Sequence, residues 1–295
     1  MDLPDDPTLP FFSYGLFKPG QLGYYRIEDY VDEAVKADIE GKLYERDGTP
    51  ILVEKNRGTV QGNLLKLNQG DGEQLYESVA EVEPEKQYRW VERTVSIGDS
   101  SQNANVLLGR NPTRGSTDLP GQKWDGSTDP LFTDALDVVE EVIEEDTEFD
   151  WEDKKSFFRL HQAYLLLWSS IERYISLRYG LRGRFGDQSI RDKRNKMAEE
   201  EGFREGLETV YSTDRPRERV VRAGRPQDDA KLDPEDPVAS LDYYYQVRSN
   251  LSHRGKSAPI DFDILRHSLE ELYTIFRSYV LPAALENYSQ EQPPA

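Results

Sequence analysis

The chain of 295 residues contains no cysteine, only three histidines and two methionines. Without cysteine it can form neither a disulfide nor a thiolate metal site, and it cannot use a thiolate nucleophile. No apolar run reaches the roughly 18 residues that are needed to span a bilayer. Residues 1–6 lack the basic start and apolar stretch of a secretory signal. We therefore expect a soluble, cytoplasmic protein that has no membrane partner and needs no metal or other cofactor.

Positive charge is also scarce. The sequence holds 56 Asp and Glu against 37 Lys and Arg, which gives a formal net charge of -19. Dense carboxylates keep a protein hydrated in a high-salt cytoplasm, so this composition favours a halophilic archaeon as the source, although an acidic mesophilic protein would look similar. Residues 173–225 depart from this average, because basic residues outnumber acidic ones there. The local excess indicates either a nucleic-acid footprint or a helical surface of alternating salt bridges.

The periodicity of apolar residues divides the chain into two parts. The first contains short apolar or alternating runs that predict strands at residues 10–14, 35–44, 58–67, 88–95 and 105–108, a turn at 47–50 and one helix at 72–80. Residues 111–130 are rich in Gly, Pro, Ser, Thr and Asp, and we expect a linker there. The remainder has helical spacing, with a short helix at about 188–201, and predicts an antiparallel helical bundle.

One segment near the C-terminal end, residues 243–256, brings an arginine and a histidine together. Arg248 lies on the apolar stripe of a predicted helix, where a guanidinium is costly unless it is paired or faces a polar cleft. His253, five residues later, would lie about 140° around the helix from Arg248. The two groups can meet if the helix ends near Ser252, as Gly255 indicates, or if a second copy of the chain completes the site across a two-fold axis.

The run Tyr-x-Val-Arg-Ser-Asn-Leu-Ser-His-Arg-Gly-Lys between two helices resembles the HEPN family, over about residues 150–280. Members of that family are helical bundles that usually dimerise, and many are metal-independent endoribonucleases. The resemblance implies that Arg248 holds the scissile phosphate of RNA while His253 acts as general acid or base in attack by the adjacent 2′-hydroxyl. Asn250 and Ser249 would be polar helpers, although many active members have Asn or Asp at the position of Ser249. A structural role for the same residues is the alternative.

A second segment, residues 12–20, is an apolar strand that runs into a glycine turn. It is either a plain strand end or a nest of backbone N–H groups that binds an anion, because glycine allows close approach to the backbone. Its run Tyr-Gly-x-x-Lys-Pro-Gly is similar to that of the gamma-glutamylcyclotransferases and their AIG2-like relatives, and later strands match in order over about residues 10–110. The resemblance implies that Tyr14, Gly15, Leu16 and Phe17 hold the carboxylate of a substrate.

The same resemblance places a catalytic base at Glu83, shortly before a strand that begins with Tyr88, a further residue of the binding site. A glutamate buried in a small barrel would have a raised pKa and could move a proton from the α-amine of a gamma-glutamyl amine to the leaving amine, forming 5-oxoproline. Alternatively, Glu83 belongs to a solvated acidic rim with Glu81 and Glu85. The chain departs from the family pattern at four positions, which make the lip of the pocket more apolar: Leu16, Phe17, Ala80 and Pro84.

The sequence thus predicts an α+β protein with a gamma-glutamylcyclotransferase-like mixed-sheet barrel over residues 8–110, a linker over 111–130 and an all-α HEPN-like bundle over 131–285. The first hypothesis for its function is metal-independent cleavage of RNA by a homodimer, in stress response, as a toxin or in defence, with a barrel that binds or modifies a small molecule. The alternative is conversion of gamma-glutamyl amines to 5-oxoproline, with the bundle used for dimerisation only. A third hypothesis is binding of ligand and RNA without catalysis. The RNA target, the barrel ligand and any coupling between the domains stay open.

Overall fold

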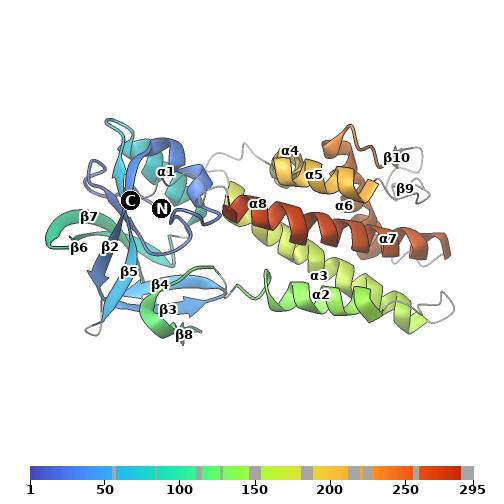
Figure 1. Cartoon of the computed structure of the whole chain (residues 1–295), viewed down its shortest axis with the longest axis horizontal. Coiled ribbons are helices and arrows are strands. Elements are labelled where there is room, and N and C mark those ends of the chain that lie inside the picture. Colours follow the sequence, from blue (N-terminus) through green and yellow to red (C-terminus); the bar gives the residue numbers. More distant parts are fainter. Residues whose placement is uncertain are drawn as a thin grey trace. The chain divides into compact units, whose positions relative to one another are not determined.

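A computed structural model describes residues 1–54, 58–83, 85–110, 115–126, 129–145, 154–180, 189–211, 220–221, 228–254 and 259–286. The chain divides into two compact units. The first unit is formed mainly by Met1–Pro130, and the second by Leu131–Ile175 together with the helices that follow residue 188. Figure 1 shows the barrel strands in the first unit and the long helices in the second. The prediction of an α+β protein with a helical C-terminal part is confirmed.

A closed barrel of five strands is the centre of the first unit. The strands lie in the order β1, β5, β2, β6 and β7, and β7 closes the barrel by pairing in parallel with β1. Their bounds are β1 (Phe11–Ser13), β2 (Val31–Glu40), β5 (Thr59–Leu67), β6 (Tyr88–Ile97) and β7 (Ser100–Gly109). Two 3-10 turns, η1 (Tyr24–Arg26) and η2 (Glu28–Tyr30), and the helix α1 (Gly72–Val82) lie in the connections.

The short strand β1 is held firmly on both sides. Phe11 is paired with Leu65 on β5 and with Asn105 on β7. Gly62 on β5 lies so close to β1 that a Cβ atom there would be 2.5 Å from the carbonyl oxygen of Ser13, so a larger residue would push the two strands apart. The end of β1 is therefore a fixed point from which the chain enters the loop that follows it.

A three-stranded antiparallel sheet, in the order β4, β3 and β8, completes the first unit. Its strands β3 (Lys42–Arg46) and β4 (Thr49–Val53) form a hairpin whose loop residues Asp47 and Gly48 both have positive φ (52° and 72°), as a type I′ turn requires. The prediction of one strand over residues 35–44 was wrong, because the chain changes sheets at Gly41. We also missed β4, since its short buried run after the turn has no alternation.

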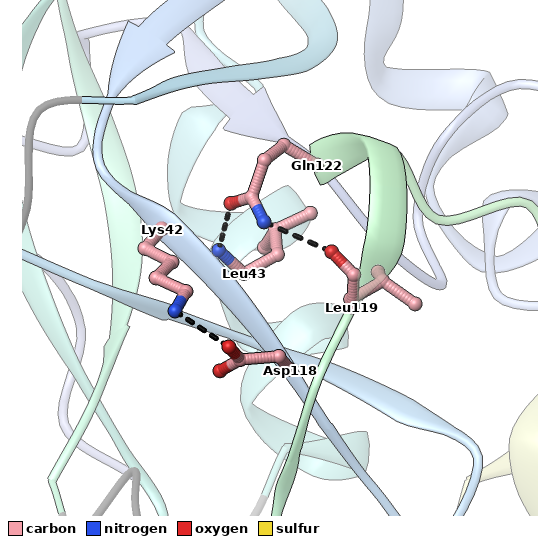
Figure 2. A network of polar contacts seen from close by, with 5 residues as sticks. All are labelled: Lys42, Leu43, Asp118, Leu119 and Gln122. Atoms are coloured by element: carbon pink, nitrogen blue, oxygen red, sulfur yellow. Dashed lines mark hydrogen bonds and ion pairs between the residues drawn. The ribbon is translucent and has the colours of Figure 1, made fainter.

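Part of the segment that we expected to be a linker extends this sheet. It contains β8 (Thr117–Asp118), which pairs with β3, and the 3-10 turn η3 (Pro120–Gln122). Figure 2 shows the attachment: Lys42 Nζ lies 2.8 Å from Asp118 Oδ2, the N–H of Leu43 donates to Gln122 Oε1 at 2.6 Å, and Gln122 Nε2 donates to the Leu119 carbonyl at 2.9 Å. A strand of two residues is too short to have a recognisable period in the sequence.

The second unit consists of helices. They are α2 (Asp134–Glu144), α3 (Lys154–Tyr179), α4 (Ile190–Glu199), α5 (Glu201–Tyr211), α6 (Pro237–Arg254), α7 (Pro259–Ile275) and α8 (Leu281–Glu286), with a π-helical turn at Phe276–Val280 and a small sheet of β9 (Val220–Val221) and β10 (Asp229–Ala230). Helix α5 was missed in the sequence. Within the described residues, no helix combines the length and apolar character that crossing a bilayer requires.

Buried tyrosines join the helices of the second unit. The Tyr164 hydroxyl on α3 donates to the carbonyl oxygen of Tyr244 on α6 at 2.7 Å, and the Tyr244 hydroxyl donates to Glu271 Oε2 on α7 at 2.9 Å. All three residues are buried. These bonds satisfy polar atoms inside an apolar core, where an unpaired group would be costly.

Candidate functional site

Tyr14 lies directly after β1 and connects two parts of the first unit. Its hydroxyl donates a hydrogen bond to the carbonyl oxygen of Leu107 on β7 (2.8 Å) and accepts one from the N–H of Leu52 on β4 (3.4 Å). The side chain is buried. The hydroxyl thus bridges a strand of the barrel and a strand of the hairpin.

Tyr88 reaches the same hairpin from the start of β6. Its buried hydroxyl donates to the carbonyl oxygen of Pro50 on β4 at 3.1 Å. Burial raises the pKa of Tyr14 well above its usual value, and the charges of Tyr88 and Glu83 raise it further, against the effect of the hydrogen bond from Leu52. The structure therefore brings Tyr14, Tyr88 and Glu83 close enough for their charges to interact.

Glu83 is placed by the end of helix α1. Four buried residues orient this helix on the barrel: Leu75, Tyr76, Val79 and Val82. The N–H of Glu83 donates to the Val79 carbonyl at 3.0 Å, and the extended backbone of Glu83 (φ -83°, ψ 123°) ends the helix. Glu83 is half-buried at this helix end, which corrects our expectation of a glutamate enclosed in the barrel.

The acidic neighbours of Glu83 have different surroundings. Glu81 forms an ion pair with Arg26 on η1, and Glu85 is exposed. Of the three, Glu83 is the one whose charge acts on Tyr14. The three glutamates therefore do not form a uniform acidic rim.

The loop after Tyr14 is buried and contains three successive main-chain N–H groups that are not used in its turn. It turns sharply, because the N–H of Lys18 donates to the carbonyl of Gly15 at 3.0 Å. Gly15 lies against the hairpin, where a Cβ atom would be 2.6 Å from Pro50 Cγ. Within the described part of the chain, the N–H groups of Gly15, Leu16 and Phe17 find no hydrogen-bond acceptor. Successive free N–H groups of this kind can bind an anion.

The side chains of Leu16 and Phe17 do not face a ligand. They are 5% and 2% exposed, and the Phe17 ring lies 6.1 Å from the ring of Phe11 in the core. Burial takes both residues away from the surface, so they do not form the exposed apolar lip that was expected at these two positions.

The arginine of the second predicted site is paired. Arg248 on α6 is half-buried, and its Nη2 lies 3.2 Å from Glu172 Oε1 on α3. Its guanidinium carbon lies 5.7 Å from the ring centroid of Tyr245. Pairing with a carboxylate explains how an arginine is tolerated on an apolar stripe, and this carboxylate would compete with the phosphate of RNA.

Two other side chains of that segment have described surroundings. Asn250 is buried, and its Oδ1 accepts a hydrogen bond from Gln246 Nε2 at 2.9 Å, while Ser249 is half-buried. The side chain of His253 lies outside the described residues. Helix α6 continues to Arg254, close to the end that Gly255 indicated, and the meeting of Arg248 with His253 stays a prediction.

Cleavage of RNA by this segment stays a prediction with a simple test. Wild-type protein and the His253→Ala variant are incubated with mixed RNA in EDTA, and the products are resolved by electrophoresis. Metal-independent cleavage by wild type that is lost in His253→Ala is the predicted result. Equal cleavage by both proteins, or none by wild type, would remove the ribonuclease hypothesis. Light scattering of the same samples tests the predicted homodimer.

Two further residues near the first site were missed by the sequence analysis. Lys18 is 7% exposed, and its Nζ donates to the carbonyl oxygen of Trp124, which is also buried. The two residues are far apart in the chain, so no local pattern reveals their contact. Lys18 is part of the Tyr-Gly-x-x-Lys-Pro-Gly run, but no role was assigned to it from the sequence.

Comparison with known proteins identifies the first unit. Residues 11–126 match the family described as gamma-glutamyl cyclotransferase, AIG2-like, and the match ends before the helical unit. None of the curated proteins matches the chain. Among solved structures, an uncharacterized protein from Pyrococcus horikoshii is similar, with 20% identity, a TM-score of 0.31 and coverage of 40% of this chain and 90% of that one. Residues 11–126 thus form an AIG2-like gamma-glutamylcyclotransferase domain.

Proposed function

We propose that the first unit releases 5-oxoproline from a gamma-glutamyl amine, with Glu83 as the residue that transfers the proton. The observation that carries this proposal is the place of Glu83, which ends helix α1 half-buried and near enough to the buried hydroxyl of Tyr14 to help burial and Tyr88 raise its pKa. The family match over residues 11–126 supports the same chemistry.

The three ionisable groups of the site have different parts in the reaction. Burial raises the pKa of Tyr14 above its usual value, so Tyr14 stays protonated and cannot serve as a base near neutral pH. The hydroxyls of Tyr14 and Tyr88 already donate to main-chain carbonyls, which fixes both rings as walls of the site. Glu83 is the group that is left to accept a proton.

The proposed reaction is an internal transfer of an acyl group. The neutral α-amino nitrogen of the substrate attacks its γ-carbonyl carbon, and a new C–N bond closes a five-membered ring. Glu83 takes a proton from this nitrogen and gives it to the nitrogen of the leaving amine as the original amide C–N bond breaks. The products are 5-oxoproline and a free amine, and no water is consumed.

The loop at residues 15–17 would hold the α-carboxylate of the substrate. Its free N–H groups can donate charge-assisted hydrogen bonds, which are stronger than bonds between neutral groups. This contact would present the α-amine to Glu83 in a fixed orientation, because the same substrate carbon carries both the carboxylate and the amine. Orientation of this kind supplies a large part of the rate of internal reactions.

Cyclisation of three related substrates tests the proposal; the ring product is 5-oxoproline from a gamma-glutamyl alkylamine and 5-oxoprolinamide from its α-carboxamide analogue. We expect the wild type to convert a gamma-glutamyl alkylamine, to convert its α-carboxamide analogue with kcat/KM lower by about 10- to 100-fold, since the charge-assisted bonds are weakened, and to leave the N-acetyl analogue intact. Chromatography of the products measures all three. Absence of the ring product from every substrate, or release of glutamate in its place, would overturn the proposal.

A further inference from the structure

Lys18 is a buried cation close to the proposed site, and its amine is held by the main chain. Its Nζ donates to the carbonyl oxygen of Trp124. Burial lowers the pKa of Lys18 to about 8, an effect that Lys123 increases and Asp125 opposes. A methionine of similar length would fill the same space without the desolvation of a charge. An amine at this position therefore indicates that the hydrogen bond from Lys18 to Trp124 has a role in the protein.

Trp124 in turn binds the hairpin of β3 and β4. Its indole Nε1 donates to the carbonyl oxygen of Gly48, in the turn between β3 and β4, at 3.1 Å. Trp124 belongs to residues 117–126, a segment that we name the strap. The strap is attached to β3 through the N–H of Leu119, which donates to the carbonyl of Leu43 at 3.2 Å. Two hydrogen bonds thus lead from Lys18 through Trp124 to the tip of the hairpin.

The loop and the hairpin that this bridge joins are two sides of the proposed site. The loop carries the free N–H groups of residues 15–17, and Gly15 touches Pro50 of the hairpin. The hairpin holds the hydroxyls of Tyr14 and Tyr88 through its main chain. Movement of the loop away from the hairpin would therefore displace the carboxylate-binding groups relative to the tyrosines and to Glu83.

We propose that Lys18 is a positioning residue for the substrate carboxylate: by binding the strap, it holds the N–H groups of residues 15–17 in place beside the hairpin. This inference rests on the proposed function. Lys18 acts through the main chain and the strap, and it does not need to touch the substrate. Trp124 is the second member of the same bridge.

Amide hydrogen exchange, followed by mass spectrometry, measures the bridge directly. The proteins are wild type, Lys18→Met, Lys18→Arg, which keeps a donor, and Trp124→Phe, which removes the indole donor. Lys66→Met is the matched control, because Lys66 on β5 is half-buried and pairs with Glu33 instead of the strap. We expect exchange in peptides that cover residues 14–23 and 47–53 to be at least about tenfold faster in Lys18→Met and Trp124→Phe. Lys18→Arg and Lys66→Met should stay close to wild type.

Steady-state kinetics on the same five proteins separate positioning from a general loss of structure. With a gamma-glutamyl alkylamine, Lys18→Met is expected to raise KM by about tenfold and to change kcat by less than about threefold, since the lost contact serves binding of the carboxylate. With the α-carboxamide analogue, Lys18→Met and wild type should have the same kcat/KM. Lys18→Arg should recover most of the lost affinity.

The outcomes distinguish this inference from the function on which it rests. If wild type is active and Lys18→Met equals Lys66→Met in both exchange and KM, the positioning role is wrong and the proposed function is untouched. An equal loss of kcat/KM on the carboxylate and carboxamide substrates would also overturn the positioning role. If wild type converts no gamma-glutamyl amine, the proposed function fails and the positioning role fails with it.

Discussion

Replacing Glu83 with glutamine should lower kcat for 5-oxoproline release by about 10³-fold and leave KM within about threefold. The amide keeps the size and polarity of the side chain but cannot accept and return a proton, and transfer of this kind contributes about 10²- to 10⁴-fold to a rate. Binding should be little affected, because in the proposed function the loop at residues 15–17, and not Glu83, holds the carboxylate of the substrate. Initial rates of product formation over a range of substrate concentrations give both constants.

Two neighbouring glutamates provide matched controls for Glu83→Gln. Glu85→Gln changes an exposed carboxylate two residues away, and Glu81→Gln breaks the ion pair with Arg26 without touching Tyr14. Both variants should keep kcat within about threefold of wild type, because Glu85 is exposed and Glu81 is paired with Arg26, and neither acts on Tyr14. A full rate in Glu83→Gln, or an equal loss in all three variants, would show that Glu83 is not the base.

The second large effect concerns pH: between pH 8 and pH 10.5, the free energy of unfolding of wild type should rise by about 3 kcal/mol relative to Lys18→Met. The pKa of Lys18 is lowered from its ordinary value of 10.5 to about 8, mainly by burial. In this interval the unfolded state binds the lysine proton and the folded state has lost it, so raising the pH favours folding. Below pH 8 both states are protonated, and the full desolvation cost of the buried charge is present.

Urea unfolding of the two proteins at constant salt, in steps from pH 7 to pH 10.5, measures this difference. Groups other than Lys18 titrate in both proteins and cancel from the comparison. Lys66→Met is the control for loss of a half-buried lysine outside the strap, and its difference from wild type should change less with pH than that of Lys18→Met. A flat difference for Lys18→Met would mean that the amine is solvated in the folded protein.

The elements that sequence patterns predicted correctly are those with a long, regular period, such as β5, β6 and α3. Helix α5 was missed because Gly202 and Gly206 read as helix breakers. In the structure they allow close packing, since a Cβ atom at Gly202 would be 2.7 Å from the carbonyl oxygen of Tyr279 and one at Gly206 would be 3.1 Å from Ile275 Cα. The reason for these glycines lies in a helix about 75 residues away, which no local window contains.

The two candidate sites differ in how much the sequence could reveal. Tyr14, Glu83 and Tyr88 were found through family motifs, and the structure brings them into one electrostatic group. The partner of Arg248 could not be found, because Glu172 is 76 residues away on another helix. The hydrogen bond between Lys18 and Trp124 joins residues that lie 106 positions apart in the sequence, so it could not be predicted either. Contacts between residues so far apart in the sequence depend on how helices and strands pack, and a single sequence does not show this packing.

The hydrogen bonds of Tyr14 and Tyr88 also have a consequence for self-association. Strand β4 is an outer strand of its sheet, and outer strands present main-chain groups that can pair with a strand of another molecule. Here the N–H of Leu52 is occupied by Tyr14, the carbonyl of Pro50 is occupied by Tyr88, and Pro50 has no N–H to donate. The two hydroxyls take the place of a neighbouring strand. Tyr14 and Tyr88 thereby also protect this edge against aggregation, and variants that lack their hydroxyls would leave its main-chain groups unpaired.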